Sequence, residues 1–266
     1  MKEFKDFSVI IVNYKSEEHL DRCLTSLYAL FGCEVSEEII IVNNYPEEAL
    51  EKIQQKFPAV KVISNQKNGG FGKGNNAGAH LAQGKYLFFL NPDTEIISGS
   101  LIKIFEKFET DNNLGAIGSC LITEKGELQK WSAGQEVTFW DLVKNNLGFL
   151  SSRRIWTSEK EIGAGWIAGT AFFIPREYFL NLGGFDERIF MYFEDVDLCK
   201  RIRETEKKIT YFPEFKVLHK CGSAYSGEGS NWQKQNYYDS LVYYFEKHRP
   251  KSEAVIVKIL RNLFFK

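Results

Sequence analysis

The stretch Val9-Ile-Ile-Val-Asn-Tyr14 sets the fold of this chain, because an unbroken run of β-branched residues is followed at once by polar ones. A short continuous apolar run that stops in this way predicts a buried strand. Similar runs occupy residues 39–42, 60–63 and 86–90, and a polar or glycine-rich segment follows each of them. The first third of the chain therefore predicts four buried strands.

Helical patterns lie between these predicted strands. Between the first two strands, apolar side chains recur at spacings of three and four residues, at Leu20, Leu24, Leu27 and Phe31. After the second strand, Pro46 predicts the first turn of another helix, in which Glu47 and Glu48 suit the positive end of the helix dipole. Strands that alternate with helices predict a mostly parallel α/β sheet with helices on both faces.

Polar residues gather at one end of the predicted strands. In parallel sheets, ligands bind beyond the carboxyl ends of the strands. Asn13, Asn43 and Asp93 follow three of the strands, and Asn68-Gly-Gly-Phe-Gly-Lys-Gly-Asn-Asn-Ala-Gly78 follows the other. The sequence thus predicts a ligand site along this edge of the sheet.

The glycine-rich segment contains a formal match to the dinucleotide-binding fingerprint, Gly72-x-Gly74-x-x-Ala77. The match follows the third predicted strand rather than the first, so it does not favour a Rossmann dehydrogenase. The chain also lacks a P-loop motif (Gly, four residues, then Gly-Lys-Ser or Gly-Lys-Thr). The segment is either a backbone that approaches a ligand closely or an ordinary tight loop.

Two residues at predicted strand ends suit a hard cation. Asp93 lies in Leu90-Asn-Pro-Asp-Thr94, where proline stiffens a short turn. One or two carboxylates commonly hold a cation that bridges phosphates, although an Asp also bonds its own turn. His219 ends a strand predicted at 216–219, and a lone histidine is either a ligand or a structural residue.

Three acidic residues crowd the start of a helix predicted to begin at residue 194. Glu194, Asp195 and Asp197 directly follow Tyr192 and Phe193. Carboxylates stabilise helix N-termini, but three of them in four positions exceed what that role needs. A carboxylate beside aromatic rings has partly apolar surroundings, which raise its pKa toward that of a general base. We therefore predict that one of the three acts as a base.

The second half of the chain is less regular. It predicts further strands at 116–122, 171–174 and 209–212, and an aromatic-rich helix at 231–247. Residues 131–161 show no clear period. Because no linker is evident, we predict one catalytic domain over residues 1–248, with two lobes that meet at about residue 122.

Composition excludes several classes of protein. The 266 residues include 34 basic and 35 acidic ones, so no overall positive charge favours nucleic acid as a partner. The five cysteines are scattered without CxxC spacing, which is typical of a reducing cytosol. The apolar run near the N-terminus stops at Val12, too early for a signal peptide or a membrane span. We expect a cytoplasmic protein.

The last residues, 249–266, form a basic tail with five basic residues and one acidic residue. Within 252–266, apolar side chains follow a helical spacing at Val255, Ile256, Ile259, Leu260 and Leu263. Lys258 and Arg261 point away from that stripe. Such a basic amphipathic helix either lies in a membrane interface, here the inner face of the cytoplasmic membrane, or packs on the body or on another subunit.

In this order, the motifs resemble the family 2 glycosyltransferases, which have the GT-A fold, and most of all the rhamnosyltransferase-like branch of bacteria. The resemblance implies a donor-binding lobe up to about residue 122 and an acceptor lobe from there to about residue 248. It covers most of the chain up to about residue 245, and its motifs continue to His219. Its seven blocks are Ser8-Val-Ile-Ile-Val-Asn-Tyr14, Ile41-Val-Asn-Asn44, residues 68–78, Leu90-Asn-Pro-Asp93, Gly165-Trp-Ile-Ala-Gly-Thr-Ala171, Gly183-Gly-Phe-Asp-Glu187 and Met191-Tyr-Phe-Glu-Asp-Val-Asp-Leu198. It implies a single GT-A type α/β domain with a mostly parallel central sheet flanked by helices.

The resemblance also implies roles for individual residues. It implies donor contacts for Asn13, Tyr14, Asn43, Asn44, Gly70, Gly72, Lys73, Asn76 and Asn91. Trp166 and Gly169 would line the acceptor side, and Asp93 and His219 would hold Mn2+ or Mg2+. Asp195 matches the catalytic base of the family, with Glu194 beside it.

The chain departs from the family pattern at two positions. Asn43 stands where the family usually has an Asp that receives the ring N–H of the donor base, and an amide oxygen accepts without charge assistance. Asn91 replaces the first Asp of the DxD motif, which leaves Asp93 as the acidic ligand of that motif.

We therefore expect an inverting, metal-dependent enzyme that transfers a sugar to a polysaccharide or lipid-linked glycan, such as O-antigen or cell wall polysaccharide. The resemblance implies rhamnose from a dTDP donor. A UDP-sugar donor and a non-catalytic binding subunit of a polysaccharide assembly complex stay open as alternatives. A glycosidase also uses two carboxylates but needs no metal–diphosphate site. Residues 131–161 would choose the acceptor, and whether the chain forms a homodimer is left open.

Overall fold

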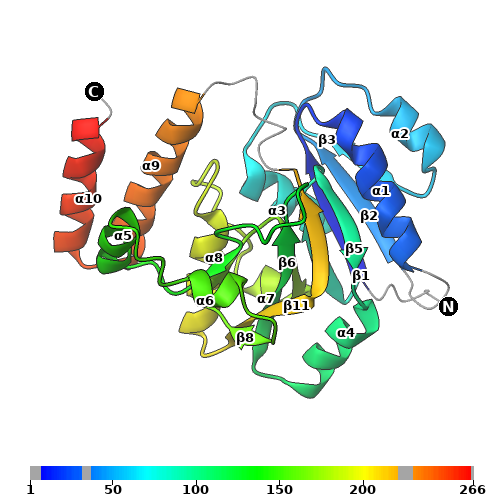
Figure 1. Cartoon of the computed structure of the whole chain (residues 1–266). Helices are drawn as coiled ribbons and strands as arrows, with labels where there is room; N and C mark the ends of the chain where they lie inside the picture. Colours follow the sequence, from blue (N-terminus) through cyan, green and yellow to red (C-terminus); the bar gives the residue numbers. More distant parts are fainter. Residues whose placement is uncertain (1–6, 32–36, 221–229, 265–266) are drawn as a thin grey trace.

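The structure, a computed structural model, describes residues 7–31, 37–220 and 230–264. It is an α/β fold with one large central sheet and helices on both of its faces (Figure 1). Within the described ranges this sheet has nine strands, in the order β3-β2-β1-β4-β10-β6-β11-β5, with β8 on β11. The single α/β fold with a central sheet confirms the fold class predicted from the sequence.

The strands of the large sheet come from both halves of the chain. They are β1 (Phe7–Asn13), β2 (Glu37–Asn43), β3 (Lys61–Ser64), β4 (Tyr86–Leu90), β5 (Thr94–Ser98), β6 (Leu114–Ile122), β8 (Ile162–Gly163), β10 (Ala171–Pro175) and β11 (Lys208–His219). Strands β1 to β4, β6 and β11 run in one direction, whereas β10 and β5 are antiparallel to their neighbours. A small second sheet pairs β7 (Ala133–Gly134) with β9 (Trp166–Ile167).

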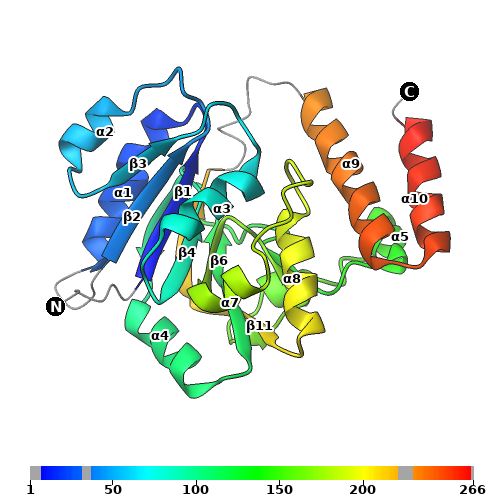
Figure 2. The same ribbon diagram turned by 180° about the vertical axis from the view of Figure 1, so that it is seen from behind.

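Alternate side chains of the buried strands face two different layers of helices. In β1, Val9 and Ile11 join a core cluster with α1 (Glu17–Phe31), α2 (Glu51–Lys56) and α4 (Leu101–Thr110). Ile10 and Val12 join a second cluster on the other face, where α3 (Phe71–Leu81), α7 (Arg176–Asn181) and α8 (Glu194–Glu204) pack (Figure 2). Because both faces are covered, residues 9–12 at the centre of the strand are all apolar.

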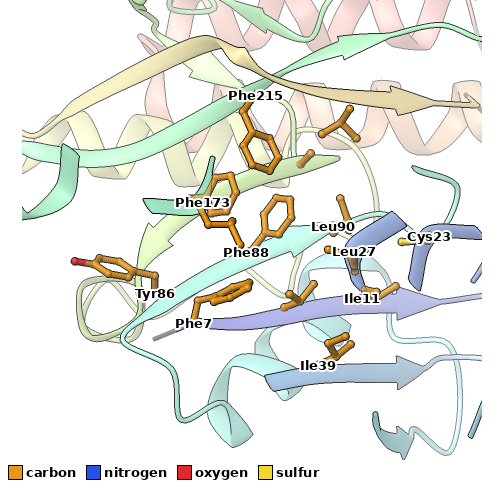
Figure 3. Packing of buried hydrophobic residues seen from close by; sticks show 14 of the residues in the cluster. Phe7, Ile11, Cys23, Leu27, Ile39, Tyr86, Phe88, Leu90, Phe173 and Phe215 are labelled. Atoms are coloured by element: carbon orange, nitrogen blue, oxygen red, sulfur yellow. The ribbon is translucent and has the colours of Figure 1, made fainter. Parts of the chain in front are cut away.

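Stacked aromatic rings join the two halves of the sheet. Phe88 of β4 lies directly opposite Phe173 of β10, and their ring centroids are 4.0 Å apart in a stacked arrangement (Figure 3). Phe215 of β11 contacts both rings edge-on. Aromatic pairs of this kind contribute about 0.5–1.5 kcal/mol beyond the area that they bury. The centre of the sheet is therefore well packed where strands from distant parts of the chain meet.

The structure corrects several expectations about individual elements. No helix begins at Pro46: residues 46–48 form a turn, in which the Glu48 backbone N donates to the Tyr45 carbonyl at 3.0 Å, and α2 begins at Glu51. The segments 209–212 and 216–219 belong to one strand, β11, whose register shifts between them. The region 131–161, whose sequence shows no clear period, contains β7, α5 (Phe139–Asn146) and α6 (Arg153–Trp156).

Helices α9 (Ser230–His248) and α10 (Lys251–Phe264) lie side by side beyond α8 (Figures 1 and 2). Ala254 and Val257 of α10 are buried in a cluster with α9. The predicted apolar stripe of α10 faces outward instead, and its exposed side chains are Val255, Ile256, Ile259, Leu260 and Leu263. Within the described ranges, no helix combines the length and the apolar character needed to cross a membrane.

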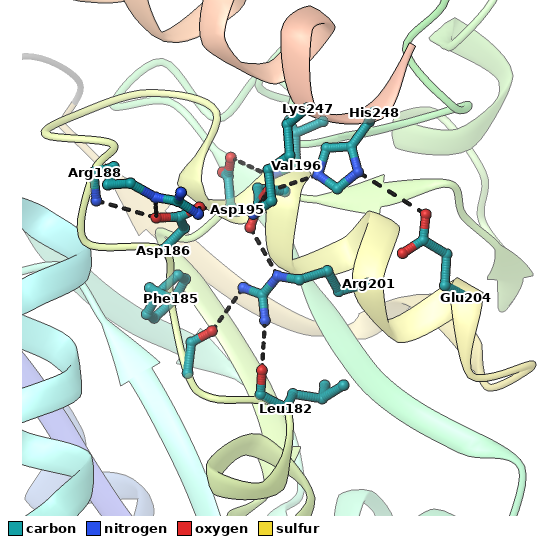
Figure 4. A network of polar contacts seen from close by, with 12 residues as sticks. Leu182, Phe185, Asp186, Arg188, Asp195, Val196, Arg201, Glu204, Lys247 and His248 are labelled. Atoms are coloured by element: carbon teal, nitrogen blue, oxygen red, sulfur yellow. Dashed lines mark hydrogen bonds and ion pairs between the residues drawn. The ribbon is translucent and has the colours of Figure 1, made fainter. Parts of the chain in front are cut away.

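A buried ionic network ties α9 to the start of α8 (Figure 4). The Asp197 carboxylate is fully buried, and its Oδ2 accepts a hydrogen bond from Arg201 Nε at 2.8 Å. Its Oδ1 accepts from Lys247 Nζ at 2.6 Å and lies 2.7 Å from Nε2 of His248. Burial alone would raise the pKa of Asp197, but these partners hold that pKa below its usual value. Asp197 is thus an anchor between two helices.

Asp197→Asn is expected to lower the free energy of unfolding by about 3 kcal/mol, because it leaves buried cationic groups without their counter-charge. Glu109→Gln, which removes one partner of the exposed pair with Lys85, is the control and should change little. Denaturant titrations of the two variants and the unchanged protein measure both effects. Equal unfolding free energies for all three proteins would contradict the anchoring role.

The same variant is expected to change the response to acid. A lowered folded-state pKa gives stability that is present above the usual Asp value of about 4 and is lost as the pH falls through the folded-state pKa. Asp197→Asn lacks this titration, so its unfolding free energy should depend less on pH below about 4 than that of the unchanged protein. Thermal melts at a series of acidic pH values check this expectation.

Candidate active site

A cavity of about 760 Å³ opens at the carboxyl ends of β1 and β4, next to the N-terminus of α8. Residues from both halves of the chain line it. Of the residues predicted to form the site, the cavity brings together Tyr14, Asn91, Asp93, Trp166, Gly169, Glu194, Asp195 and His219. It has the volume and the mixed polar and apolar walls that small-molecule sites usually have.

Asp93 and His219 face each other in this cavity. Strand pairing brings them together, because His219 at the end of β11 lies opposite Thr94 at the start of β5. Nε2 of His219 is 3.4 Å from Oδ1 of Asp93, and both side chains are buried. Nδ1 of His219 lies 2.9 Å from Oε1 of Gln129, so an Nδ1–H that donates to Gln129 leaves Nε2 as an electron-pair donor.

These residues fit a divalent cation whose other ligands come from a substrate. Among the described residues, no group of three or more His, Cys, Asp or Glu side chains could hold a metal by itself. Mg2+ and similar ions, however, commonly bind through one or two protein ligands together with phosphate oxygens. Beside the pair, Oδ1 of Asn91 is buried on the cavity wall, and no described residue forms a hydrogen bond with it. Such an orphaned oxygen suits a site that a polar ligand completes.

Asp195 is the second residue of α8 and is held by backbone groups. Its Oδ2 accepts a hydrogen bond from Gly169 N, and its Oδ1 accepts one from Val196 N, each at 2.8 Å. Burial nevertheless raises the pKa of the Asp195 carboxyl group. A carboxylate that is oriented by two fixed donors and has a raised pKa has the properties of a general base.

Glu194 is the more deeply buried neighbour of Asp195. It is 6% exposed, and its Oε2 has no hydrogen-bond partner among the described residues. Burial raises the pKa of Glu194, and the negative charge of Asp195 raises it further. Two adjacent buried carboxyl groups do not both ionise readily. Glu194 therefore favours its neutral form while Asp195 carries the charge.

A strained turn directly precedes Glu194 and Asp195 and sets their position at the start of α8. Tyr192 and Phe193 both have φ of about +65°, in the left-handed region that non-glycine residues rarely adopt. Each such residue costs about 1–2 kcal/mol. Packing opposes this cost, because Phe193 is buried against the Tyr237 and Tyr244 rings of α9, at 5.3 and 5.6 Å. The helix α9 thus supports the turn that precedes the candidate base.

The side of the cavity around Trp166 and Gly169 includes residues that the sequence did not single out. Trp166 of β9 lies opposite Gly134 of β7, and Gly169 packs closely against Phe71 and Asp195. The cavity wall continues with residues of the unreadable segment and of α9, namely Gln135, Val137, Asp141, Leu142, Asn145 and Tyr237. Residues 131–161 were expected to choose the acceptor, but no pattern in that segment singles out individual residues, and the signal for Tyr237 was the aromatic character of α9.

Several residues predicted to bind the donor lie outside this cavity. Asn13, Asn43 and Asn44 form a buried hydrogen-bonded group at the ends of β1 and β2. Asn44 Nδ2 donates to the Gly70 carbonyl at 3.0 Å. Gly70 itself has φ of +92° and lies against the Phe190 backbone, so the start of α3 tolerates no side chain there.

Asn76 and Gly72 of α3, which were predicted to contact the donor, pack against Phe185. Asn76 exchanges two hydrogen bonds of 2.9 Å with the backbone of Phe185, which clamps the loop before α8 onto α3. Gly72 lies beneath Phe185, where a Cβ atom would be only 3.0 Å from the Phe185 side chain. Lys73 is exposed and lies 3.8 Å from Glu187. These residues of the glycine-rich segment thus pack α3 against the loop that precedes α8.

Comparisons with known proteins agree with this geometry. The family model described as Glycosyl transferase family 2 matches residues 8–179, well over half of the chain. The N-acetylglucosaminyl-diphospho-decaprenol L-rhamnosyltransferase of Mycobacterium tuberculosis (strain H37Rv) is 24% identical over 259 residues, covering 90% of this chain and 84% of that protein. Rhamnosyltransferase WbbL of Escherichia coli (strain K12) is 25% identical over 221 residues, covering 79% of this chain and 82% of that protein.

Solved structures share the fold. GalNAc-T7, crystallised with UDP, GalNAc and Mn2+, superposes with a TM-score of 0.70 at 19% identity, and the match covers 92% of this chain and 48% of that one. The present chain therefore spans about half the length of that protein. S. aureus TarS 1–349 in complex with UDP gives a TM-score of 0.59 at 17% identity, covering 91% of this chain and 72% of that one.

The paired carboxyl groups and the Asp93–His219 pair lie in one cavity of a GT-A type sheet, and the family model spans β1 and β4, at whose carboxyl ends this cavity opens. This chain belongs to glycosyl transferase family 2 and is a glycosyltransferase.

Proposed function

We propose that this glycosyltransferase is an inverting, divalent-metal-dependent enzyme that moves a sugar from a nucleoside-diphosphate donor onto a cell-surface glycan. The observation that carries the proposal is the shared cavity of Asp195 and the Asp93–His219 pair. A base that takes the proton of an acceptor hydroxyl and a site for a leaving diphosphate have to lie on opposite sides of one sugar. Both requirements fit this arrangement.

The donor that we propose is dTDP-rhamnose, because two relatives that match most of this chain are named rhamnosyltransferases. A UDP-sugar on the same fold is the alternative, since GalNAc-T7 and TarS were each crystallised with UDP. A non-catalytic binding subunit is less well supported, because Asp93, Asp195 and His219 are all present on the cavity.

The residues of the chain account for proton transfer and orientation. Asp195 accepts the proton from the attacking hydroxyl, while Gly169 N and Val196 N hold its carboxylate in place. Burial and the charge of Asp195 raise the pKa of Glu194, which favours a single negative charge in this pair, on Asp195. Asp93 and His219 would hold Mn2+ or Mg2+, which supplies positive charge for the departing diphosphate when bound.

We also propose that the apolar stripe of α10 binds the inner face of the cytoplasmic membrane. Val255 and Leu263, which are 55% and 66% exposed, mark the two ends of the stripe. The M. tuberculosis relative is named for an acceptor on a decaprenol diphosphate, which is a lipid carrier. A lipid-linked acceptor would bring the enzyme to a membrane, and a basic amphipathic helix suits that surface.

Asp195→Asn is expected to lower the turnover number by about 100-fold or more, because it removes the base but keeps the shape of the side chain. Donor affinity should stay within about twofold, a margin well under 1 kcal/mol. Transfer assays and donor titrations measure the two quantities, with exposed Glu159→Gln as the matched control. Near-normal turnover by Asp195→Asn would show that the base lies elsewhere.

Asp93→Asn is expected to weaken donor binding about tenfold or more when Mn2+ is present, because the variant lacks the charged ligand of the metal. In the unchanged protein, EDTA should weaken donor binding to the level of the variant. In Asp93→Asn, EDTA should have little further effect. Donor affinities measured with and without Mn2+ test this, and equal metal responses of the two proteins would argue against a metal at Asp93.

The membrane proposal predicts that Ile259→Glu/Leu263→Glu abolishes co-sedimentation with vesicles that contain anionic lipid, because each buried charge opposes insertion. The substituted residues are exposed, so α10 should still pack on α9 through Ala254 and Val257. Glu159→Gln again serves as the control. Equal sedimentation of the variant, or a stripe that instead holds a homodimer together in size-exclusion chromatography, would overturn the proposal.

A further inference from the structure

The turn at residues 46–48 brings a carboxylate to the carboxyl ends of β1 and β2. Because no helix starts at Pro46, Glu48 is free to turn back toward the sheet. Its Oε2 accepts a hydrogen bond of 2.6 Å from Asn13 Nδ2 at the end of β1. Glu48 is half-buried, and it lies one turn away from Asn43 at the end of β2. A negative charge therefore sits beside the position where the family usually carries an Asp.

Asn43 itself has no acceptor capacity to spare. An amide oxygen has two lone pairs, and Oδ1 of Asn43 already accepts from Asn13 Nδ2 and from Tyr45 N, each at 3.1 Å. Its Nδ2 donates to the Glu48 carbonyl at 2.9 Å. A ligand N–H could bind Asn43 only by breaking one of these buried hydrogen bonds. The amide that replaces the family's Asp therefore holds the turn in place.

The surroundings of Glu48 suit a flat, polar ring. The Tyr14 and Tyr45 rings, which follow Asn13 and Asn43 in the chain, lie 5.7 Å apart edge to face and are half-buried. Aromatic side chains stack on the faces of nucleobases. In the same place, Oδ1 of Asn13 is buried without a hydrogen-bond partner among the described residues. An orphaned acceptor in a polar group points to a donor that a ligand supplies.

We propose that Glu48, rather than Asn43, is the residue that selects the base of the donor nucleotide. Its carboxylate accepts the ring N–H that uracil, thymine and guanine carry, and Asn13 holds that carboxylate in position. Cytosine and adenine present a ring lone pair instead, which a carboxylate repels. This inference rests on the proposed function, because it assumes that the base of a nucleotide sugar lies at the ends of β1 and β2.

The test measures dissociation constants of dTDP, UDP, GDP, CDP and ADP in the presence of Mn2+. The unchanged protein should bind at least one of the first three about tenfold or more tightly than CDP, the usual scale of one charge-assisted hydrogen bond. Glu48→Gln keeps an oxygen for Asn13 but loses the charge. It should weaken binding of the preferred nucleotide at least about tenfold and leave CDP binding nearly unchanged.

Two controls separate recognition of the base from folding. Exposed Glu47→Gln removes the neighbouring charge and should bind like the unchanged protein. An analogue of the preferred nucleotide that is methylated at its ring N–H should bind the unchanged protein weakly. Glu48→Gln should bind this analogue with the same weak affinity as the unchanged protein. Because each protein is judged by the ratio of two affinities, a lower folded fraction in Glu48→Gln does not affect the result.

The outcomes separate this inference from the proposed function. If the unchanged protein prefers dTDP, UDP or GDP and Glu48→Gln keeps the full preference, the role of Glu48 is wrong while the proposed function stands. A protein that binds CDP or ADP best also overturns the role of Glu48. If none of the five nucleotides binds with Mn2+, both the nucleotide-sugar activity and the role of Glu48 fall together.

Discussion

The pairing of β10 between β4 and β6 is the interaction on which the site depends. It joins the strands of the first half of the sheet to those of the second, and the Asn91 N to Thr170 O hydrogen bond of 2.8 Å extends it beyond the strand. The turn with Asp93 therefore lies beside Gly169, which binds the candidate base Asp195. Without β10, the candidate base Asp195 and the Asp93–His219 pair would not be held together in one cavity.

The sequence predicts best those elements that are covered on both faces. Residues 9–12 of β1 and 86–90 of β4 are continuous apolar runs, because each of these side chains meets a layer of helices. Eight of the predicted site residues line the cavity. The region 131–161 has no such signal, since β7 is two residues long and α5 buries none of its side chains. The glycine-rich segment left two interpretations open for another reason. Gly74 and Gly78 make room for Val12 and Ile10, and a sequence does not distinguish close helix packing from close approach to a ligand.

Three acids at the start of α8 have three different fates, although the sequence predicts the same helix-end preference for all of them. Asp197 meets cationic side chains of α9, Asp195 accepts hydrogen bonds from Gly169 N and Val196 N, and Oε2 of Glu194 has no hydrogen-bond partner among the described residues. Because each environment comes from a different segment of the chain, only the tertiary structure separates the anchor Asp197 from the candidate base Asp195 and its neighbour Glu194. The excess of acids over what a helix end needs was the part of this arrangement that the sequence could indicate.

The error at Pro46 has the same physical origin. Glu47 and Glu48 match the preference of a helix first turn, which is worth about 0.3–1 kcal/mol per charge at an exposed position. A hydrogen bond between a charged group and a neutral partner in a half-buried site contributes about 1.5–3 kcal/mol. Asn13 offers Glu48 that stronger partner, so the chain forms a turn and the helix begins five residues after Pro46, at Glu51. The same competition places the Glu48 carboxylate at the strand ends. The family pattern usually has an Asp carboxylate there, at the position of Asn43.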